Sequence, residues 1–336
     1  MASVKVAVLG ATGRTGQTII TGLQESTETK FDIIALIRPS SLANPSTQAL
    51  RDQGVRIVTA DLVAGSHQDL VEALGGVDVV ISAIVWHRLG DEAALARAAK
   101  DAGVGRFVPC FWGPPSPRGV HMFNDMKLDS LAEIQRLHLP YTVIDVGWWT
   151  QQMVPDLPSG RTRHAAFEGM LAIPGTGDAP VALTDYRDIG RYAARVLTDP
   201  RTLNRLVLAY TEIMTFNGFM SLVERLSGEK VALPYRSGED LKRDIASAKS
   251  ALAAKPGDWQ ATLGLVVAQY LDLLGVRGDS DPERARYLGY LDFKDLYPDV
   301  RGRTAEDMLV DVLAGKPSGY VRPAGYSITA DPGVKT

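Results

Sequence analysis

The chain has 336 residues, a net charge of −3, 22% charged residues and 45% hydrophobic residues. This is the balance of an ordinary globular protein, and the lack of a basic run argues against nucleic acid as a partner. Cys110 is the only cysteine, which excludes an internal disulfide and favours a reducing compartment. No apolar run reaches the ~20 residues of a membrane span, and no signal-peptide pattern precedes the first strand. We therefore expect a cytoplasmic protein that contacts no membrane.

Short apolar runs alternate with amphipathic helical patterns through the first half of the chain. The apolar runs predict strands over residues 5–9, 33–37, 56–59, 77–84, 106–110 and 141–146. The helical patterns cover residues 14–23, 45–53, 68–74, 91–102 and 122–137. Unbroken runs of Val and Ile indicate strands that are buried on both faces. The sequence thus predicts an α/β fold with a Rossmann-type, doubly wound parallel sheet.

A glycine-rich turn joins the first strand to the first helix. Its three glycines have GxxGxxG spacing, which lets backbone amides approach a pyrophosphate at a helix N-terminus. Chance supplies this pattern roughly 0.3 times in a chain of this composition, so the flanking strand and helix carry the prediction. The alternative is a tight turn that binds nothing. We predict that the turn binds a dinucleotide through Gly10, Thr12, Gly13, Arg14, Thr15 and Gly16.

Arg38 ends the second apolar run, where a dinucleotide fold faces the adenosine ribose. An acidic residue there favours NAD, whereas a fixed cation suits the 2′-phosphate of NADP. Ser40 and Ser41 follow and can donate further hydrogen bonds to that phosphate. The alternative is a solvated arginine at a strand end. We predict NADP (NADPH) as the cofactor.

The residues after the other strands meet at the same edge of the sheet, where ligands bind in this class of fold. There we expect further cofactor contacts from Asp61, Leu62, Ser82, Ala83, Ile84 and Gly147. Aromatic residues gather at the same edge and suit a flat, ring-containing substrate. The predicted substrate-binding residues are Trp86, Phe111, Trp112, Phe123, Trp148 and Trp149. The alternative for the tryptophans is packing against the C-terminal part of the chain.

Beyond residue 150 the pattern is less regular. It predicts a Gly/Pro-rich hairpin over 170–177, a strand over 205–210, and helices over 188–197, 216–226, 238–253, 259–274 and 304–313. We expect an NADP-binding domain over 1–150 and, over 151–336, a smaller, mainly helical substrate-binding lobe interleaved with it. The tail after Pro317 is expected to be poorly held.

The predicted helix over 122–137 carries Phe123-Asn124-Asp125-Met126-Lys127. In the main short-chain dehydrogenase family, a tyrosine four residues before a lysine on such a helix donates the proton. Here Phe123 has no proton to give, while Lys127 remains. The usual tyrosine chemistry is therefore excluded.

Taken together, these motifs resemble the NmrA-like and isoflavone-reductase-like group of atypical short-chain dehydrogenases. The resemblance rests on the glycine turn, Arg38, Lys127 and the segments 101–109, 139–143 and 296–300. It implies an NADPH-dependent reductase with Lys127 beside the nicotinamide and the substrate. Where the plant reductases usually read Ser-Glu-Phe-Gly, this chain has Cys110-Phe111-Trp112-Gly113, followed by three prolines within four residues. These departures affect the expected substrate more than the expected cofactor.

Lys127 is the first catalytic candidate, because a cation stabilises the negative charge that develops on a conjugated carbonyl. The alternative is a lysine that only binds the ribose hydroxyls. His121 is the second candidate, since histidine titrates near neutrality and can relay a proton. His87 and His164 are weaker candidates. The histidine spacing predicts no metal site, and no hydrolase elbow or kinase-type phosphate loop is present.

Two functions fit these observations. The first is an NADPH-dependent reductase of a small aromatic or enone-type substrate (phenylpropanoid, isoflavonoid or polyketide-like), with a homodimer as an open alternative for its assembly. The second is an NADP-binding regulator or redox sensor that binds a protein partner, because NmrA-like regulators share the fold. A deep apolar cavity at the nicotinamide end would favour the enzyme.

Overall fold

The computed structural model describes residues 3–166 and 172–318. Within them, a five-stranded parallel sheet has the order β3-β2-β1-β4-β5. The strands are β1 (Val4–Leu9), β2 (Phe31–Ile37), β3 (Arg56–Thr59), β4 (Val79–Ser82) and β5 (Arg106–Val108). The crossover from β3 back past β1 to β4 is that of the doubly wound fold. The predicted α/β class and parallel sheet are confirmed.

Three further parallel strands continue beyond β5. A single bridge between Phe107 and Tyr141 leads to β6 (Thr142–Asp145), which pairs with β10 (Arg205–Leu208). The last strand, β13 (Tyr290–Asp292), pairs with β10. Strands from far along the chain thus extend the sheet that the N-terminal half begins. The domain boundary near residue 150 stays a prediction.

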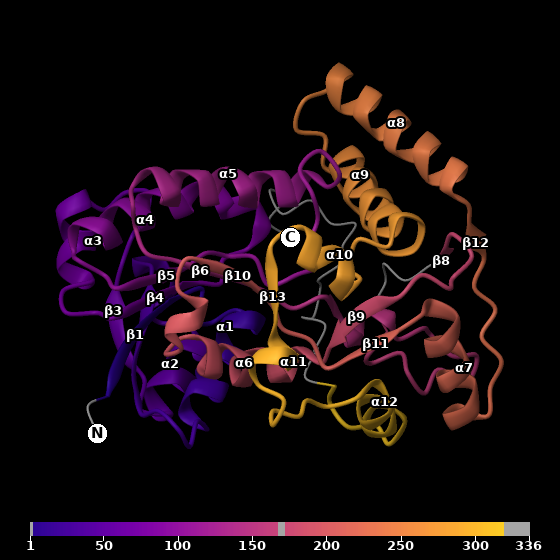
Figure 1. The fold of residues 1–336 in the computed structure, drawn as a ribbon, viewed down its shortest axis with the longest axis horizontal. Helices are drawn as coiled ribbons and strands as arrows, with labels where there is room; N and C mark the ends of the chain where they lie inside the picture. Colours follow the sequence, from indigo (N-terminus) through magenta and orange to yellow (C-terminus); the bar gives the residue numbers. More distant parts are fainter. Residues whose placement is uncertain (1–2, 167–171, 319–336) are drawn as a thin grey trace.

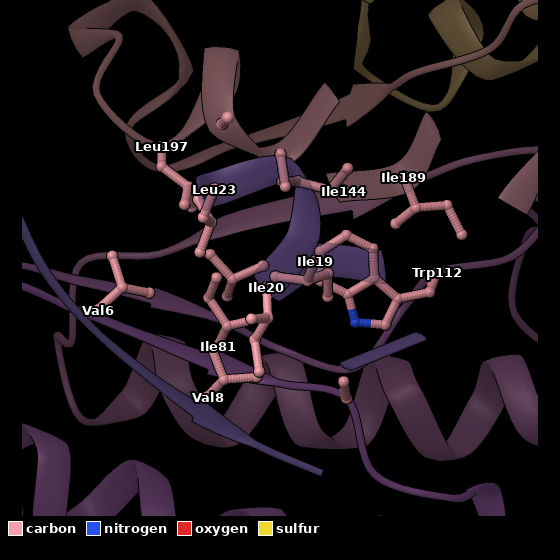
Figure 2. Close-up of a cluster of buried hydrophobic side chains, with 14 of the residues drawn as sticks. Val6, Val8, Ile19, Ile20, Leu23, Ile81, Trp112, Ile144, Ile189 and Leu197 are labelled. Carbon is pink, nitrogen blue, oxygen red and sulfur yellow. The ribbon is translucent and has the colours of Figure 1, made fainter. Parts of the chain in front are cut away.

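Helices cover both faces of the sheet (Figure 1). One face carries α1 (Arg14–Gln24), α2 (Pro45–Asp52) and α6 (Ile189–Val196), and the other carries α3 (His67–Ala73), α4 (Glu92–Asp101) and α5 (Met122–Arg136). Alternate residues of β1 point to opposite cores: Val6 and Val8 to the first, Ala7 and Leu9 to the second. Figure 2 shows the first core, where α1 lies between the sheet and α6.

The C-terminal part of the chain builds a second core. Its small sheet joins β7 (Trp148–Trp149), β9 (Val181–Thr184) and β11 (Glu212–Met214), and α7 (Phe216–Ser227) packs with α12 (Ala305–Leu313). The predicted hairpin over 170–177 is wrong in its described part. There β8 (Ile173–Pro174) pairs in parallel with β12 (Tyr235–Arg236), about 60 residues later. Residues 167–171 lie outside the described part.

Two helices project from the body beside the small sheet (Figure 1). They are α8 (Gly238–Ala254) and α9 (Trp259–Leu271), and a π-helical turn over Asp272–Arg277 continues α9. The short helices α10 (Pro282–Tyr287) and α11 (Phe293–Leu296) flank β13. The C-terminal region is mainly helical, as predicted.

Most predicted elements lie within three residues of the observed ones. The strand predicted over 106–110 ends early at Val108, because Pro109 has no backbone N–H to pair. No helix among the described residues is long and apolar enough to cross a membrane. The predicted loose tail lies outside the described residues beyond Ser318.

Candidate functional site

The glycine turn has a backbone that admits no side chain at two of its glycines. Gly10 has φ +78°, and a Cβ there would lie 2.3 Å from the Ala83 carbonyl oxygen. A Cβ on Gly16 would lie 2.2 Å from the carbonyl oxygen of Gly10. The turn therefore needs glycine for close packing of backbone on backbone, and β1, α1 and the end of β4 meet there.

The same turn presents a free helix N-terminus. Gly13 is the N-cap of α1 and provides no side-chain cap, and the first intrahelical bond runs from the Gln17 N–H to the Gly13 carbonyl. Amides of the first turn have no intrahelical partner, so they suit an anion. Gly13 is exposed, and Thr12, Arg14 and Thr15 are half-buried around it. The residues present fit a pyrophosphate.

Arg38 is exposed at the end of β2 and its Nε donates to Ser41 Oγ at 2.9 Å. Ser41 is buried, so it orients the guanidinium, whereas Ser40 is exposed. Within the described part of the chain, the two terminal nitrogens of Arg38 make no hydrogen bond. This leaves a planar, two-pronged donor of the kind that binds phosphate.

Asp61 closes the turn after β3. Its carboxylate accepts the N–H groups of Ala64 and Val63 at 2.9 and 3.0 Å, and these bonds hold its pKa below the usual range. Leu62 is half-buried against the sheet. Asp61 therefore shapes this loop through its own backbone, and its predicted cofactor contact stays a prediction.

Trp112 connects the ends of β4, β5 and β6. Its indole Nε1 donates to the Ser82 carbonyl at 2.8 Å, and its own carbonyl accepts the Trp149 indole N–H at 3.0 Å. Its ring is 4% exposed and packs in the core beside α1 (Figure 2). Trp112 is thus hydrogen-bonded within the core, and its predicted contact with the substrate stays a prediction. Gly147 ends β6 with φ +65°, tightly against Ala182.

Lys127 reaches back from α5 to the end of β5. Its Nζ donates to the Phe111 carbonyl, and a Cβ on Gly113 would lie 3.4 Å from it. Phe111 is itself buried against β6 and β10, with its ring centroid 5.7 Å from the Lys127 Nζ. Trp112 joins this segment to Ser82, and the next residue, Ala83, packs on Gly10. These contacts connect the glycine turn continuously to Lys127.

Two buried carboxyl groups lie near the Lys127 ammonium. Glu92 accepts from the Cys110 N–H at 2.8 Å and from the Ser130 hydroxyl, and Asp145 accepts from the Tyr290 hydroxyl at 2.6 Å. Burial raises the pKa of both carboxyl groups, while the charge of Lys127 lowers it. Burial thus favours the neutral form of both carboxyl groups, and the nearby ammonium favours their charged form.

His121 is the N-cap of α5, and its Nδ1 accepts the Phe123 N–H at 3.2 Å. Its side chain is 1% exposed, and burial together with the charge of Lys127 lowers its pKa to about 3. The Val266 carbonyl opposes this shift without forming a hydrogen bond of normal geometry. The expectation that His121 titrates near neutrality is therefore wrong, because the ring is buried and neutral.

An aromatic cluster, which we define as Trp86, His121, Phe123, Trp148, Trp259 and Tyr270, joins both parts of the chain. Trp86 stacks on Phe123 at 4.3 Å and on Trp259 at 5.3 Å between ring centroids. Tyr270 lies 3.9 Å from the His121 ring and 5.1 Å from the Trp148 ring. Three of the predicted substrate-binding residues, Trp86, Phe123 and Trp148, are brought together here.

The remaining candidates are not members of this cluster, although the His87 ring lies 5.3 Å from the Trp86 ring. Trp149 is half-buried, 6.1 Å from the Tyr186 ring, and Ile84 accepts a hydrogen bond from the Cys110 thiol. Burial raises the pKa of that thiol to about 12, so it is unreactive. His87 and His164 are exposed. Among the described residues no group of His, Cys, Asp and Glu could hold a metal ion.

Sequence reasoning missed Trp259, Tyr270, Glu92 and Asp145. Trp259 and Tyr270 reach the site on α9, which begins more than 120 residues after the end of α5, so no local spacing shows the contact. Glu92 and Asp145 carried a weak signal: a charged residue at the start of a helix and one at the end of an apolar strand. Their complete burial follows only from the packing.

The model of the NmrA-like family matches residues 2–255. The chain is 45% identical to the asnovolin J 5′,6′-dehydrogenase nvfM of Aspergillus novofumigatus, covering 95% of this chain and 98% of the relative. It is 29% identical to the phenylcoumaran benzylic ether reductase Betv6 of Betula pendula, over 91% of this chain and 97% of the relative.

The fold is also similar to solved structures. The binary complex of leucoanthocyanidin reductase and NADPH from Vitis vinifera has a TM-score of 0.75 and 21% identity, covering 92% of this chain and 99% of the other. The family model spans well over half of this chain and the curated relatives span nearly all of it. The resemblance stated from the sequence is confirmed: the chain belongs to the NmrA-like family.

Proposed function

We propose that this protein is an NADPH-dependent oxidoreductase that transfers hydride to a small aromatic or enone-type substrate. The observation that carries the proposal is the continuous set of contacts from the glycine turn, through Ala83 and Trp112, to the ammonium of Lys127. A dinucleotide bound by its phosphates at the turn has its reactive end along this edge of the sheet. The aromatic cluster borders the same edge.

Different residues bind different parts of the cofactor. The amides after Gly10 hold the pyrophosphate, and Arg38, oriented by Ser41, binds the 2′-phosphate. When bound, NADPH supplies the hydride. Lys127 stabilises the negative charge that develops on the substrate oxygen, and its ammonium lies near the buried carboxyl groups of Glu92 and Asp145.

The names of the relatives support an enzyme over a regulator. The 45% identical relative is named a dehydrogenase and the 29% identical one a reductase. Because one name describes oxidation and the other reduction, the direction of the reaction is tested in both senses. The division near residue 150 and the homodimer stay predictions.

The test follows NADPH oxidation against a panel of enones, quinones and flavonoid-like compounds, and NADP⁺ reduction against their saturated counterparts. We expect turnover of at least one member and a preference for NADPH over NADH. Tight NADPH binding without turnover of any member would favour the regulator. Equal affinity for NADPH and NADH would contradict the role of Arg38.

A further inference from the structure

Phe123 leaves the site without the tyrosine hydroxyl of the main short-chain dehydrogenases, but the fold brings another tyrosine close to the same place. Tyr270 of α9 packs on His121, which itself lies 5.4 Å from the Phe123 ring. The neighbouring Gln269 accepts the Met122 N–H at 3.0 Å and is buried, which fixes α9 against the start of α5. The packing on His121 and the anchoring of α9 on α5 therefore fix the position of the Tyr270 side chain.

Two buried N–H donors beside Tyr270 make no hydrogen bond of normal geometry to the described residues. The Nδ1 of His121 accepts a backbone hydrogen, so the neutral ring carries its proton on Nε2. Neither this Nε2 nor the indole Nε1 of Trp148 has a hydrogen-bond partner among the described residues, although both side chains are less than a tenth exposed. Buried donors without partners are rare in folded proteins and call for an explanation.

The other tryptophans at this edge show that the fold can satisfy such groups. The indole N–H groups of Trp112 and Trp149 donate to backbone carbonyls at 2.8 and 3.0 Å. The hydroxyl of Tyr270 makes no hydrogen bond to any described residue either, and burial raises its pKa, so it stays protonated. The three uncharged donors thus belong to rings that pack on one another, and none of them makes a hydrogen bond of normal geometry to a described residue.

We propose that Tyr270, His121 and Trp148 form a neutral hydrogen-bonding site for a substrate oxygen, which identifies the substrate as a flat conjugated ketone or a similar oxygenated ring compound. The proposal rests on the proposed function and names the group that the site recognises. Acceptor oxygens of such a compound satisfy the three donors, and its ring system packs on the aromatic cluster.

These donors stabilise charge without giving up a proton. As hydride adds to the far carbon of a conjugated ketone, the electron pair of the C=C bond moves and an enolate forms on the oxygen. The O–H and N–H groups strengthen their hydrogen bonds to this oxygen, and a proton from water then completes the α-carbon. The substrate gains one hydride and one proton, and Tyr270, His121 and Trp148 keep theirs. Because the fold holds these donors in place before the reaction, they need little reorganisation as the charge develops on the oxygen.

The test measures binding of para-nitrophenolate to the NADP⁺-loaded protein by its absorbance, since this flat ring carries a charged oxygen like that of an enolate. Tyr270→Phe keeps the ring contacts and removes only the hydroxyl, whereas Trp148→Phe keeps one aromatic ring and removes the indole N–H donor together with the second ring. We expect each change to weaken para-nitrophenolate binding roughly 10-fold. Binding of the neutral para-nitrotoluene and of NADPH is expected to stay within about twofold of wild type.

Tyr287→Phe is the matched control, because Tyr287 is 91% exposed and lies outside the cluster. Unchanged para-nitrophenolate affinity in Tyr270→Phe and Trp148→Phe, or equal loss of both probes, overturns the inference. So does a wild-type protein that binds NADPH but not para-nitrophenolate. The NADPH titration reports on the proposed function alone, so its failure is distinguished from failure of the oxygen site.

Discussion

The glycine turn and the aromatic cluster lie at the same edge of the sheet but are built in different ways. The turn is one continuous segment whose shape is fixed by backbone contacts of Gly10 and Gly16. The aromatic cluster collects residues from a 3-10 helix, a short strand and two α-helices, at positions 86, 121–123, 148, 259 and 270, which meet only in the folded chain. The comparison indicates that cofactor binding is encoded locally, whereas substrate recognition depends on long-range packing.

Gly10→Ala is expected to have the largest effect on stability and cofactor binding, because it disrupts the backbone packing of the turn. The new Cβ would lie 2.3 Å from the Ala83 carbonyl oxygen at a residue with φ +78°. We expect a loss of about 3 kcal/mol or more in the free energy of unfolding, measured by urea titration, and loss of NADPH binding.

Gly54→Ala is the control for Gly10→Ala. Gly54 has φ +79°, but a Cβ there would have no atom within 4 Å. Gly54→Ala therefore adds only the strain of a positive φ, which lowers the free energy of unfolding by about 1 kcal/mol. Equal losses in the two variants would show that close packing does not define the turn.

Lys127→Met tests the catalytic role of the residue that we place between the cofactor and the aromatic cluster. We expect kcat to fall by about 100-fold because the developing negative charge loses its cation. NADPH affinity, measured by fluorescence titration, should change little. Lys100→Met, at an exposed position on α4, is the control. A weaker affinity for NADPH with unchanged kcat would instead assign Lys127 to the ribose.

Arg38→Gln separates recognition of the 2′-phosphate from the rest of the turn. Loss of a charge-assisted contact is expected to weaken NADPH binding by roughly 10-fold or more and to leave NADH binding unchanged. Isothermal titration with both cofactors measures the difference. Arg56→Gln removes an exposed cation on β3 and serves as the control. A parallel loss for NADH would contradict a phosphate-specific role.

The pH dependence of the unfolding free energy of His121→Asn tests whether the His121 ring is buried and neutral. The pKa of His121 falls from 6.5 to about 3 on folding, so the unfolded chain binds the proton first as pH falls. Stability is therefore lost below pH 6.5, and this residue costs about 2 kcal/mol near pH 5. Asn keeps an N-cap acceptor for α5 but does not titrate. The difference in unfolding free energy between variant and wild type should shrink as the pH is lowered; a constant difference would contradict a buried neutral ring.

The contrast also explains what the sequence could predict. Apolar runs and the glycine spacing identify the strands around β1 and the turn, because these signals are local. Lys127 stands out because it follows Phe123 at the spacing of a known motif. Tyr270 and Trp259 give no such signal, since their partners lie far away in the chain. Trp112 shows another limit: its place after a strand predicts a substrate contact, but nothing in the sequence shows that its indole is hydrogen-bonded inside the core.

The most direct test of the central proposal is hydride transfer itself. NADPH carrying deuterium at the transferred position of the nicotinamide is incubated with the protein and the panel compounds, and the products are analysed by mass spectrometry. We predict a product that carries deuterium on carbon with the wild-type protein, and far less of it with Lys127→Met. Tight NADPH binding with no deuterium in any product would contradict an oxidoreductase.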